Sequence, residues 1–112
     1  RREGIKFRQG CDIHFTSNIP YKAGASSSSA MIVGLIKLLT KLYAPTKAYE
    51  PIEIGMLAYQ AEVLEHGEPG GMMDQYTISL GQVIYIDTQT YAVQTLRDSL
   101  EGLILSNSMV PK

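Results

Sequence analysis

The sequence has one cysteine, no long apolar run and almost no net charge, and each of these shortages excludes a class of protein. Cys11 has no partner for an internal disulfide, which fits a reducing compartment such as the cytoplasm. The longest apolar run, residues 30–39, contains Lys37 and is too short to span a bilayer. Ten Lys and Arg against eleven Asp and Glu leave a formal charge of −1, which gives no general attraction for nucleic acid or an anionic membrane.

Positive charge is also missing from the middle of the chain. No Lys or Arg occurs between Lys47 and Arg97, but seven acidic residues do: Glu50, Glu53, Glu62, Glu65, Glu68, Asp74 and Asp87. They form either a solvated acidic helix face or a set of carboxylates that meets a cation from outside the segment, such as a metal ion. The charge pattern alone leaves both interpretations open.

The 112 residues, 45% of them apolar and 19% charged, suffice for one modest domain. Cys11, Ile13 and Phe15 alternate with polar residues, the period-two pattern of a half-buried strand. Residues 27–43 carry apolar side chains at helical spacing on most sides, which predicts a central buried helix that Pro45 closes.

Two further helices and three strands follow in the sequence pattern. Pro51 suits the first position of a helix, and Gly67 suits its C-terminal cap. A short helix is predicted over residues 73–80, ending at Gly81. Three strand-like runs remain, at residues 83–87, 92–96 and 103–106. Strands on both sides of the helices predict the α+β class.

The first candidate site is the loop of residues 20–30, between the predicted strand and the buried helix. Its glycine and small residues let the backbone approach a ligand, and amides at a helix N-terminus suit a phosphate. Serine hydroxyls can add hydrogen bonds to phosphate or a ligand to Mg²⁺. The loop lacks the Gly-Lys-Ser/Thr of a Walker A motif. Ordinary helix capping is the alternative, although four successive serines exceed what a cap requires.

The second candidate site combines Glu62 with the segment Gly-Glu-Pro-Gly-Gly-Met-Met-Asp-Gln that ends at Gln75. Gly70 and Gly71 would let a substrate lie against the backbone beside Asp74. A carboxylate there can accept or orient a hydroxyl proton, the role of a general base. Asp74 as a helix cap and Glu62 on a solvated face are the alternatives.

Together the two segments resemble the GHMP kinase superfamily. Residues 19–30 resemble its second motif, Pro-x-x-x-Gly-Leu-Gly/Ser-Ser-Ser-Ala, and residues 61–75 resemble the Ala-Glu and Gly-x-Met-Asp-Gln of the galactokinase branch. The runs at 84–87 and 104–108 look like the strands that follow in galactokinases. The resemblance extends over residues 13–110, nearly the whole chain.

The resemblance implies a fold and a set of roles. The fold is the α+β N-terminal domain of these kinases, related to the second domain of ribosomal protein S5. Ser28 and Glu62 match the Mg²⁺ ligands, Asp74 matches the catalytic aspartate, and Gly71 with Asp74 would face the substrate. The ATP phosphates would be wrapped by Gly24, Ala25, Ser26, Ser27, Ser28 and Ser29. Phosphoryl transfer needs mainly positioning and charge neutralisation, which such a set supplies.

The sequence also departs from the family pattern. Ala25 stands in place of the usual leucine, and Ser29 stands where alanine or glycine is common. The Gly-Glu-His-x-Asp-Tyr sugar-binding segment does not occur, nor does the glycine-rich third motif with its downstream domain. We therefore expect residues 1–112 to be part of a single N-terminal domain, an incomplete and internal fragment that is inactive alone.

The predicted parent protein is a cytoplasmic, ATP-dependent sugar kinase, galactokinase-like, that uses Mg²⁺ and forms a sugar 1-phosphate. ATP and a small sugar are its expected partners, and the oligomeric state stays open. The alternatives are another GHMP kinase, acting on a uronic acid, arabinose, a heptose or an amino sugar, and a non-catalytic sensor of nucleotide or sugar. A purely structural domain is a further alternative.

Overall fold

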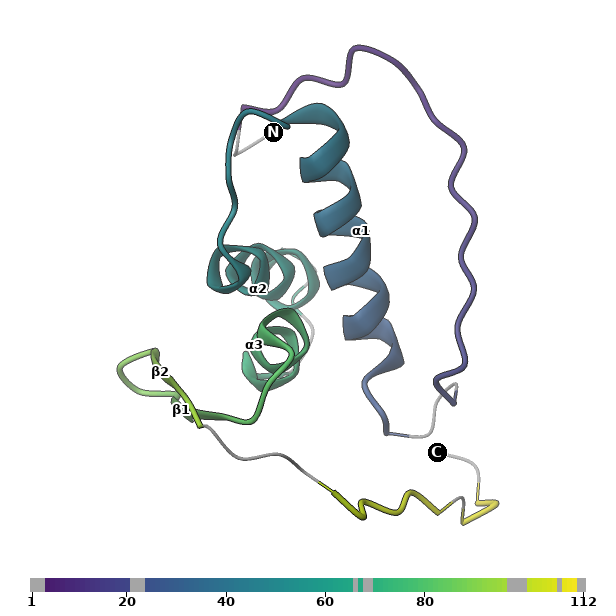
Figure 1. Ribbon diagram of the computed structural model, residues 1–112, viewed down its shortest axis with the longest axis vertical. Helices are drawn as coiled ribbons and strands as arrows, with labels where there is room; N and C mark the ends of the chain where they lie inside the picture. The colour runs from purple at the N-terminus through teal and green to yellow at the C-terminus, as the bar shows by residue number, and fades with distance from the viewer. Residues whose placement is uncertain are drawn as a thin grey trace.

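The computed structural model describes residues 4–20, 24–65, 67, 70–96, 101–106 and 108–110. In these residues three α-helices pack together and an antiparallel hairpin follows them (Figure 1). The elements in chain order are α1 (Ser27–Tyr43), α2 (Pro51–Tyr59), the π-helical turn η1 (Gln60–Leu64), α3 (Met73–Leu80), β1 (Ile84–Asp87) and β2 (Ala92–Thr95). The described residues thus form a small α+β unit.

The first helix, α1, has the predicted bounds. It begins after Ser26, whose carbonyl oxygen accepts a 3.0 Å hydrogen bond from the backbone N–H of Ala30. It ends where the N–H of Ala44 donates to the carbonyl of Thr40, one residue before Pro45. Proline cannot donate a backbone hydrogen bond, so it stops the helix where the sequence predicted.

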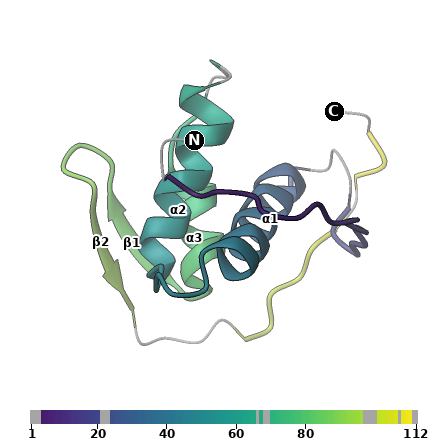
Figure 2. The same cartoon turned by 90° about the horizontal axis from the view of Figure 1, so that it is seen from above.

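The expectation that α1 is buried on most sides is wrong for the described residues. Val33 is buried in the core, but the side chains of Met31, Leu38 and Leu42 are exposed. Helices α2 and α3 both pack against α1 (Figure 2), and Glu62 of η1 contacts only the first turn of α1 through Ser28 and Ser29. A helix buries an apolar face only where another element covers that face, so its outer side chains stay in solvent.

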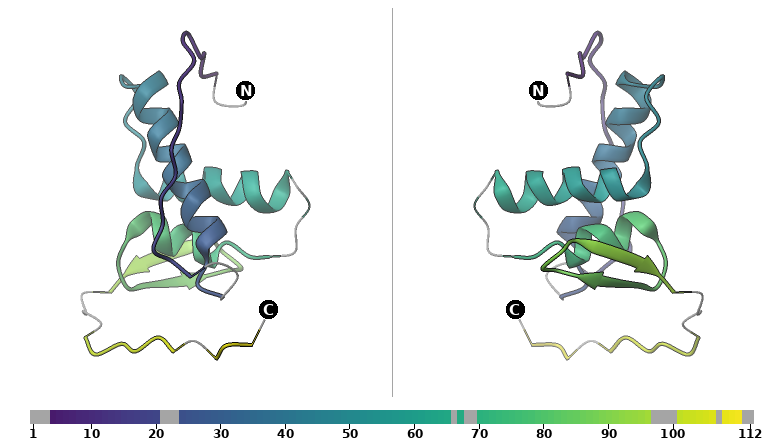
Figure 3. Two further views of the ribbon diagram at one scale, coloured as in Figure 1. Left: turned by 90° about the vertical axis from the view of Figure 1, so that its right-hand side faces the viewer. Right: turned by 90° about the vertical axis from the view of Figure 1, so that its left-hand side faces the viewer.

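Helices α2 and α3 have the most extensive contact between any two elements in the described residues, and they lie against each other in Figure 3. Pro51 occupies the first turn of α2, as predicted. A Cβ atom built on Gly55 would lie 3.0 Å from the Cδ1 and 3.2 Å from the Cα of Tyr76, so only glycine permits this approach. The core cluster beside this contact consists of Val33, Ile54 and Ala58.

Helix α2 runs on into a π-helical turn. The N–H of Glu65 donates a 2.8 Å hydrogen bond to the carbonyl of Gln60, five residues back, in place of the four of an α-helix. Gly67, the predicted cap, has a left-handed φ of 66° and lies two residues beyond Glu65, where the helix ends. The π turn carries Glu62, and such turns are frequent at functional sites.

The hairpin confirms two predicted strands to within one residue at each end. Gly81, with a φ of 70°, ends α3 as predicted, and β1 then pairs with β2 from Ile84 opposite Thr95. In the connecting turn the N–H of Gln89 donates to Oδ1 of Asp87 at 2.9 Å. That bond, with those from Thr90, holds the pKa of the Asp87 carboxyl below its usual value.

Two other predicted strands, at residues 11–15 and 103–106, do not form. A strand needs a hydrogen-bonded neighbour, and among the described residues β1 and β2 pair only with each other. The N-terminal segment instead runs beside α1 without regular secondary structure (Figure 1). It touches the helix where the ring of Phe7 meets that of Tyr43 edge-on at 4.7 Å, and where the Tyr43 hydroxyl donates to the carbonyl of Gln9.

The chain exposes an unusually large surface for its size. Its accessible area is 9104 Å², against about 6,100 Å² for a compact monomer of this mass. Its radius of gyration is 15.5 Å, whereas a compact domain of this length has one of about 13 Å. Among the described residues, apolar side chains of the end segments contribute to this area, with Phe7 at 64% and Leu103 at 81% exposure.

Candidate active site

The predicted phosphate loop lies at the N-terminus of α1. Gly24 has a φ of 74°, and Ser26, an L-residue, also lies in the left-handed region at 58°. A non-glycine residue in that region is uncommon, and such residues cluster where a loop receives a ligand. The first amides of an α-helix have no partner within the helix and carry partial positive charge. Residues 21–23 of the motif lie outside the described residues.

The loop serines and Glu62 meet directly, 33 and 34 residues apart in the chain. The Ser28 hydroxyl donates to Oε1 of Glu62 at 3.1 Å, and the Ser29 hydroxyl donates to Oε2 at 2.9 Å. Sequence reasoning had set Ser28 beside Glu62 only through the family resemblance. The structure brings the two predicted metal ligands together by their own side chains.

A third donor to the same carboxylate comes from α3. Nε2 of Gln75 donates to Oε2 of Glu62 at 2.7 Å. Glu62, on η1, is therefore held by side chains from α1 and from α3, so the carboxylate sits where three helical segments converge. All three donors are neutral groups, so none of them cancels the negative charge of Glu62. That charge is available to a cation.

Gln75 is 3% exposed, and its Oε1 atom is buried with no hydrogen-bond partner. A buried polar atom without a partner costs about 1–3 kcal/mol. Nothing in the sequence singles out Gln75 beyond its position after Asp74 in the family motif. Only the folded chain shows that its amide, together with Ser29, contacts Glu62.

Asp74 and Gly71 lie next to this cluster along the chain. Asp74 is in the first turn of α3, where the helix dipole favours a carboxylate, and its side chain is half-buried. It immediately precedes Gln75, the residue of α3 that contacts Glu62. Gly71 is exposed, and a Cβ atom added to it would meet nothing within 4 Å. Open space therefore exists at the backbone where a substrate was predicted to lie.

The site chemistry suits Mg²⁺, which the family resemblance implies. Mg²⁺ prefers hard oxygen ligands and is usually bound by one or two carboxylates together with substrate phosphates and waters. Ser28 and Glu62 supply oxygens of this kind 3.1 Å apart. In the described ranges no three His, Cys, Asp or Glu side chains are grouped to hold a metal. The residues fit a cation shared with phosphate, not one enclosed by protein alone.

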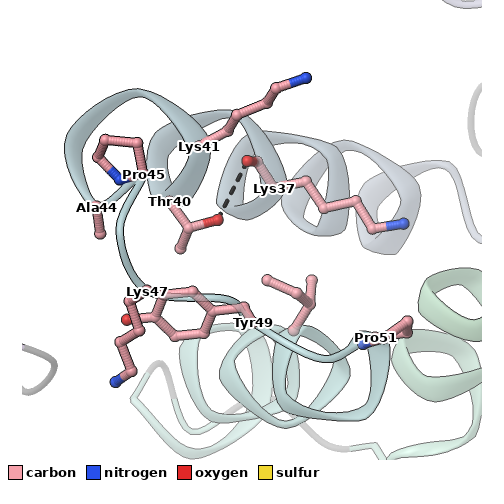
Figure 4. Close-up of a pocket in the computed structure, with 9 residues that line it drawn as sticks. Lys37, Thr40, Lys41, Ala44, Pro45, Lys47, Tyr49 and Pro51 are labelled. Carbon is pink, nitrogen blue, oxygen red and sulfur yellow. Dashed lines mark hydrogen bonds between the residues drawn. The ribbon is translucent and has the colours of Figure 1, made fainter.

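A separate cavity of about 490 Å³ lies at the other end of α1. Lys37, Lys41 and Lys47 line it, but their ammonium groups point in different directions and do not converge (Figure 4). Thr40 in this cavity is twelve residues from Ser28, about 18 Å along the helix. The cavity is distinct from the cluster around Glu62, and none of the predicted site residues lines it.

Comparison with known proteins identifies the family. The sequence model described as "GHMP kinases N terminal domain" matches residues 1–82. The chain belongs to this family, as the motifs predicted. In the described ranges no helix is both long enough and apolar enough to cross a membrane.

Curated relatives narrow the resemblance to one branch. The chain is 36% identical to a galactokinase of Pyrococcus furiosus over 92 residues, 80% of this chain and 25% of that protein. It is 35% identical to a galactokinase of Actinobacillus pleuropneumoniae over 91 residues, 79% of this chain and 23% of that one. It is 29% identical to a galactokinase of Bacillus subtilis over 113 residues, which is 96% of this chain and 28% of that protein.

The chain thus spans about a quarter of the length of these curated relatives. No solved structure matches it.

Proposed function

We propose that this chain is part of an ATP-dependent sugar kinase that transfers the γ-phosphate of ATP to a sugar hydroxyl and yields a sugar 1-phosphate. The observation that carries the proposal is the hydrogen bond between Ser28 and Glu62. It joins the serine loop to an acidic residue 34 positions away, in a chain that is similar to galactokinases. A loop used only for helix capping would have no need of a distant carboxylate.

In this proposal the loop holds the phosphates of ATP. The backbone amides of residues 24–29 surround the phosphate oxygens, and the dipole of α1 favours their negative charge. Ser28 and Glu62 hold the Mg²⁺ that accompanies ATP. When bound, that ion neutralises charge on the phosphate oxygens. Glu62 is suited to this because its three hydrogen-bond donors leave its charge uncompensated.

Asp74 acts on the sugar in the same proposal. Its carboxylate accepts a hydrogen bond from the attacking hydroxyl and orients the oxygen towards the γ-phosphorus. A bond forms between that oxygen and phosphorus, the bond from phosphorus to the bridging oxygen of ADP breaks, and the hydroxyl proton passes to Asp74. Gly71 leaves room at the backbone for the sugar. A reaction that consumes ATP and a chain with a single thiol, Cys11, both suit the cytoplasm.

The test is Asp74→Asn in the full-length protein that carries this chain. We expect turnover of the sugar to fall by about 10²–10⁴-fold, because the hydroxyl loses its proton acceptor. Binding of Mg·ATP, followed by calorimetry, should change less than about twofold, since Asp74 is assigned to the sugar. Near-normal turnover in Asp74→Asn would remove Asp74 from the base role.

Asp87→Asn is the matched control, because Asp87 ends β1 and its carboxylate accepts hydrogen bonds from the hairpin turn, not from the serines or Gln75. It should leave turnover unchanged. The same calorimetry with Mg·ATP, alone and with galactose, separates the alternatives. Heat from both ligands supports a galactose kinase, and turnover of a uronic acid, arabinose, a heptose or an amino sugar in its place identifies another member of the family. Binding of ATP with no turnover of any of these sugars indicates a sensor.

A further inference from the structure

The two oxygens of the Glu62 carboxylate are not equivalent in this structure. Oε2 accepts two hydrogen bonds, from Ser29 at 2.9 Å and from Gln75 at 2.7 Å. Oε1 accepts one, from Ser28 at 3.1 Å. A carboxylate oxygen offers about two lone-pair directions. Oε2 is therefore saturated, and the lone pair that stays open is on Oε1, on the side of Ser28.

Burial and hydrogen bonding of Gln75 both centre on its contact with Glu62. It is 3% exposed and its Nε2 makes the shortest of the three hydrogen bonds to Glu62. Its own Oε1 is buried without a partner, so its amide is only half satisfied. An apolar side chain of the same length would fill the same space with no unpaired oxygen. The amide is thus costly for packing, and its hydrogen bond to Glu62 is what distinguishes it from such a side chain.

We propose that Gln75 is a positioning residue that decides which oxygen of Glu62 meets the metal ion. By occupying Oε2 it prevents the carboxylate from turning, and it leaves Oε1 beside the Ser28 hydroxyl as the open ligand. Ser29 shares this task, so its hydroxyl serves Glu62 and not phosphate. The inference rests on the proposed function for the identity of the cation, and it assigns no contact between Gln75 and the cation itself.

Residues that orient metal ligands through hydrogen bonds have a measurable effect. Their loss usually weakens metal affinity by about 10–100-fold without removing the ligand. A residue that only supports the fold has a different signature, because its loss lowers stability and leaves metal affinity as it was. Replacing Gln75 distinguishes a positioning role from a structural one, because removal of its unpaired buried oxygen is not expected to destabilise the protein.

The experiment uses Gln75→Met in the full-length protein, with Mn²⁺ as a spectroscopic probe in place of Mg²⁺. Mn²⁺ is titrated by electron paramagnetic resonance in the presence of a non-hydrolysable ATP analogue. We expect its dissociation constant to rise by about tenfold, with a melting temperature no lower than that of the wild type. The Mg²⁺ concentration for half-maximal turnover should rise in parallel, and the KM for the sugar should stay the same.

Ser79→Ala is the matched control. Ser79 is on the same helix, is 4% exposed, and donates its hydroxyl hydrogen bond to the carbonyl of Pro51, away from Glu62. Its loss should lower the melting temperature and leave Mn²⁺ affinity unchanged. Ser29→Ala, which removes the other donor to Oε2, provides a second route should Gln75→Met fail to fold. It should weaken Mn²⁺ binding in the same direction.

The outcomes separate this inference from the proposed function. Mn²⁺ affinity within twofold of the wild type in Gln75→Met, or in Ser29→Ala if the former does not fold, overturns the positioning role even if the wild type phosphorylates a sugar. Weakened Mn²⁺ binding in a protein that phosphorylates no sugar supports the positioning role and contradicts the kinase. A wild type that binds no Mn²⁺ with the nucleotide analogue contradicts both.

Discussion

Two regions of this chain contain similar apolar side chains, but one region buries them and the other leaves them exposed to solvent. In the helical unit, defined as α1, α2 with η1, and α3, Ile54 is 3% exposed. In the flanking segments, defined as residues 4–20, 101–106 and 108–110, Ile104 is 86% exposed. The difference lies in what each region needs from its surroundings. A helix satisfies its backbone within itself, whereas a strand requires a neighbouring strand.

The comparison explains which elements the chain can build by itself. Each helix has its own hydrogen bonds and needs only one apolar face covered, and the three helices cover one another. A strand formed by the alternating residues Cys11, Ile13 and Phe15 could not satisfy its backbone hydrogen bonds within itself. Those residues are exposed in the structure. An alternating pattern therefore indicates a preference for the strand conformation. The strand forms only where a second strand can pair with it.

The largest expected difference between the two regions comes from the same substitution made in both. Ile54→Ala should lower the free energy of unfolding of the 112-residue chain by about 2–5 kcal/mol, because it opens a cavity in the core. Ile104→Ala should change it by less than about 0.5 kcal/mol, because that side chain is in water. Urea unfolding followed by circular dichroism measures both. Equal losses would erase the distinction between the helical unit and the flanking segments.

A smaller change in the free energy of unfolding is expected when alanine replaces glycine at three positions. Gly55→Ala should cost about 1–2 kcal/mol, because the new Cβ lies 3.0 Å from the ring and 3.2 Å from the backbone of Tyr76. Gly34→Ala, in α1 with nothing within 4 Å, should gain about 0.5–1 kcal/mol from helix propensity. Gly10→Ala, in the flanking segment, should have almost no effect. The same unfolding curves apply, and a gain from Gly55→Ala would show that α2 and α3 are not tightly packed.

The smallest expected effect is on the stability of the chain at alkaline pH. Burial, and then the nearby Tyr91 and Tyr59, raise the pKa of Tyr76 above its usual value of 10.0. Above pH 10 the unfolded chain therefore loses a proton that the folded chain keeps, so stability is complete below this pH and falls above it. The slope for one proton is at most about 1.4 kcal/mol per pH unit. Tyr76→Phe should flatten the decline between about pH 9.5 and 11 in unfolding curves.

Tyr85→Phe is the control for the pH series, because Tyr85 lies on β1 and is 59% exposed. It should leave the alkaline decline as steep as in the wild type. If Tyr76→Phe had no more influence than Tyr85→Phe, the buried position of Tyr76 in the helical unit would be in question.

Local signals in the sequence predicted most of the helical unit. Pro51 at the start of α2 and Gly81 after α3 set helix ends through backbone geometry alone, which one sequence is enough to show. The two strands of the hairpin were predicted from their strand-like runs at residues 83–87 and 92–96, but their pairing was not. The strands at 11–15 and 103–106 were not predicted correctly, because strand formation depends on a partner that periodicity does not reveal.

The site was predictable only in part. The pair of Ser28 and Glu62 came from the family resemblance, because residues 34 positions apart have no local signal that joins them. The π turn that presents Glu62 has no sequence signature either. The contacts of Gln75 and Ser29 with Oε2 depend on how three helices pack, which becomes visible only in three dimensions.

The carboxylate of Glu62 also has a consequence for the order in which the chain folds. Its bond to Gln75 closes a loop of 13 residues, whereas its bond to Ser28 closes one of 34. Chain entropy makes the longer loop costlier by about 0.9 kcal/mol. Helices α2 and α3 can thus orient the carboxylate before α1 arrives with its serines. We therefore expect the bond from Ser28, which joins the two motifs, to form later in folding than the bond from Gln75.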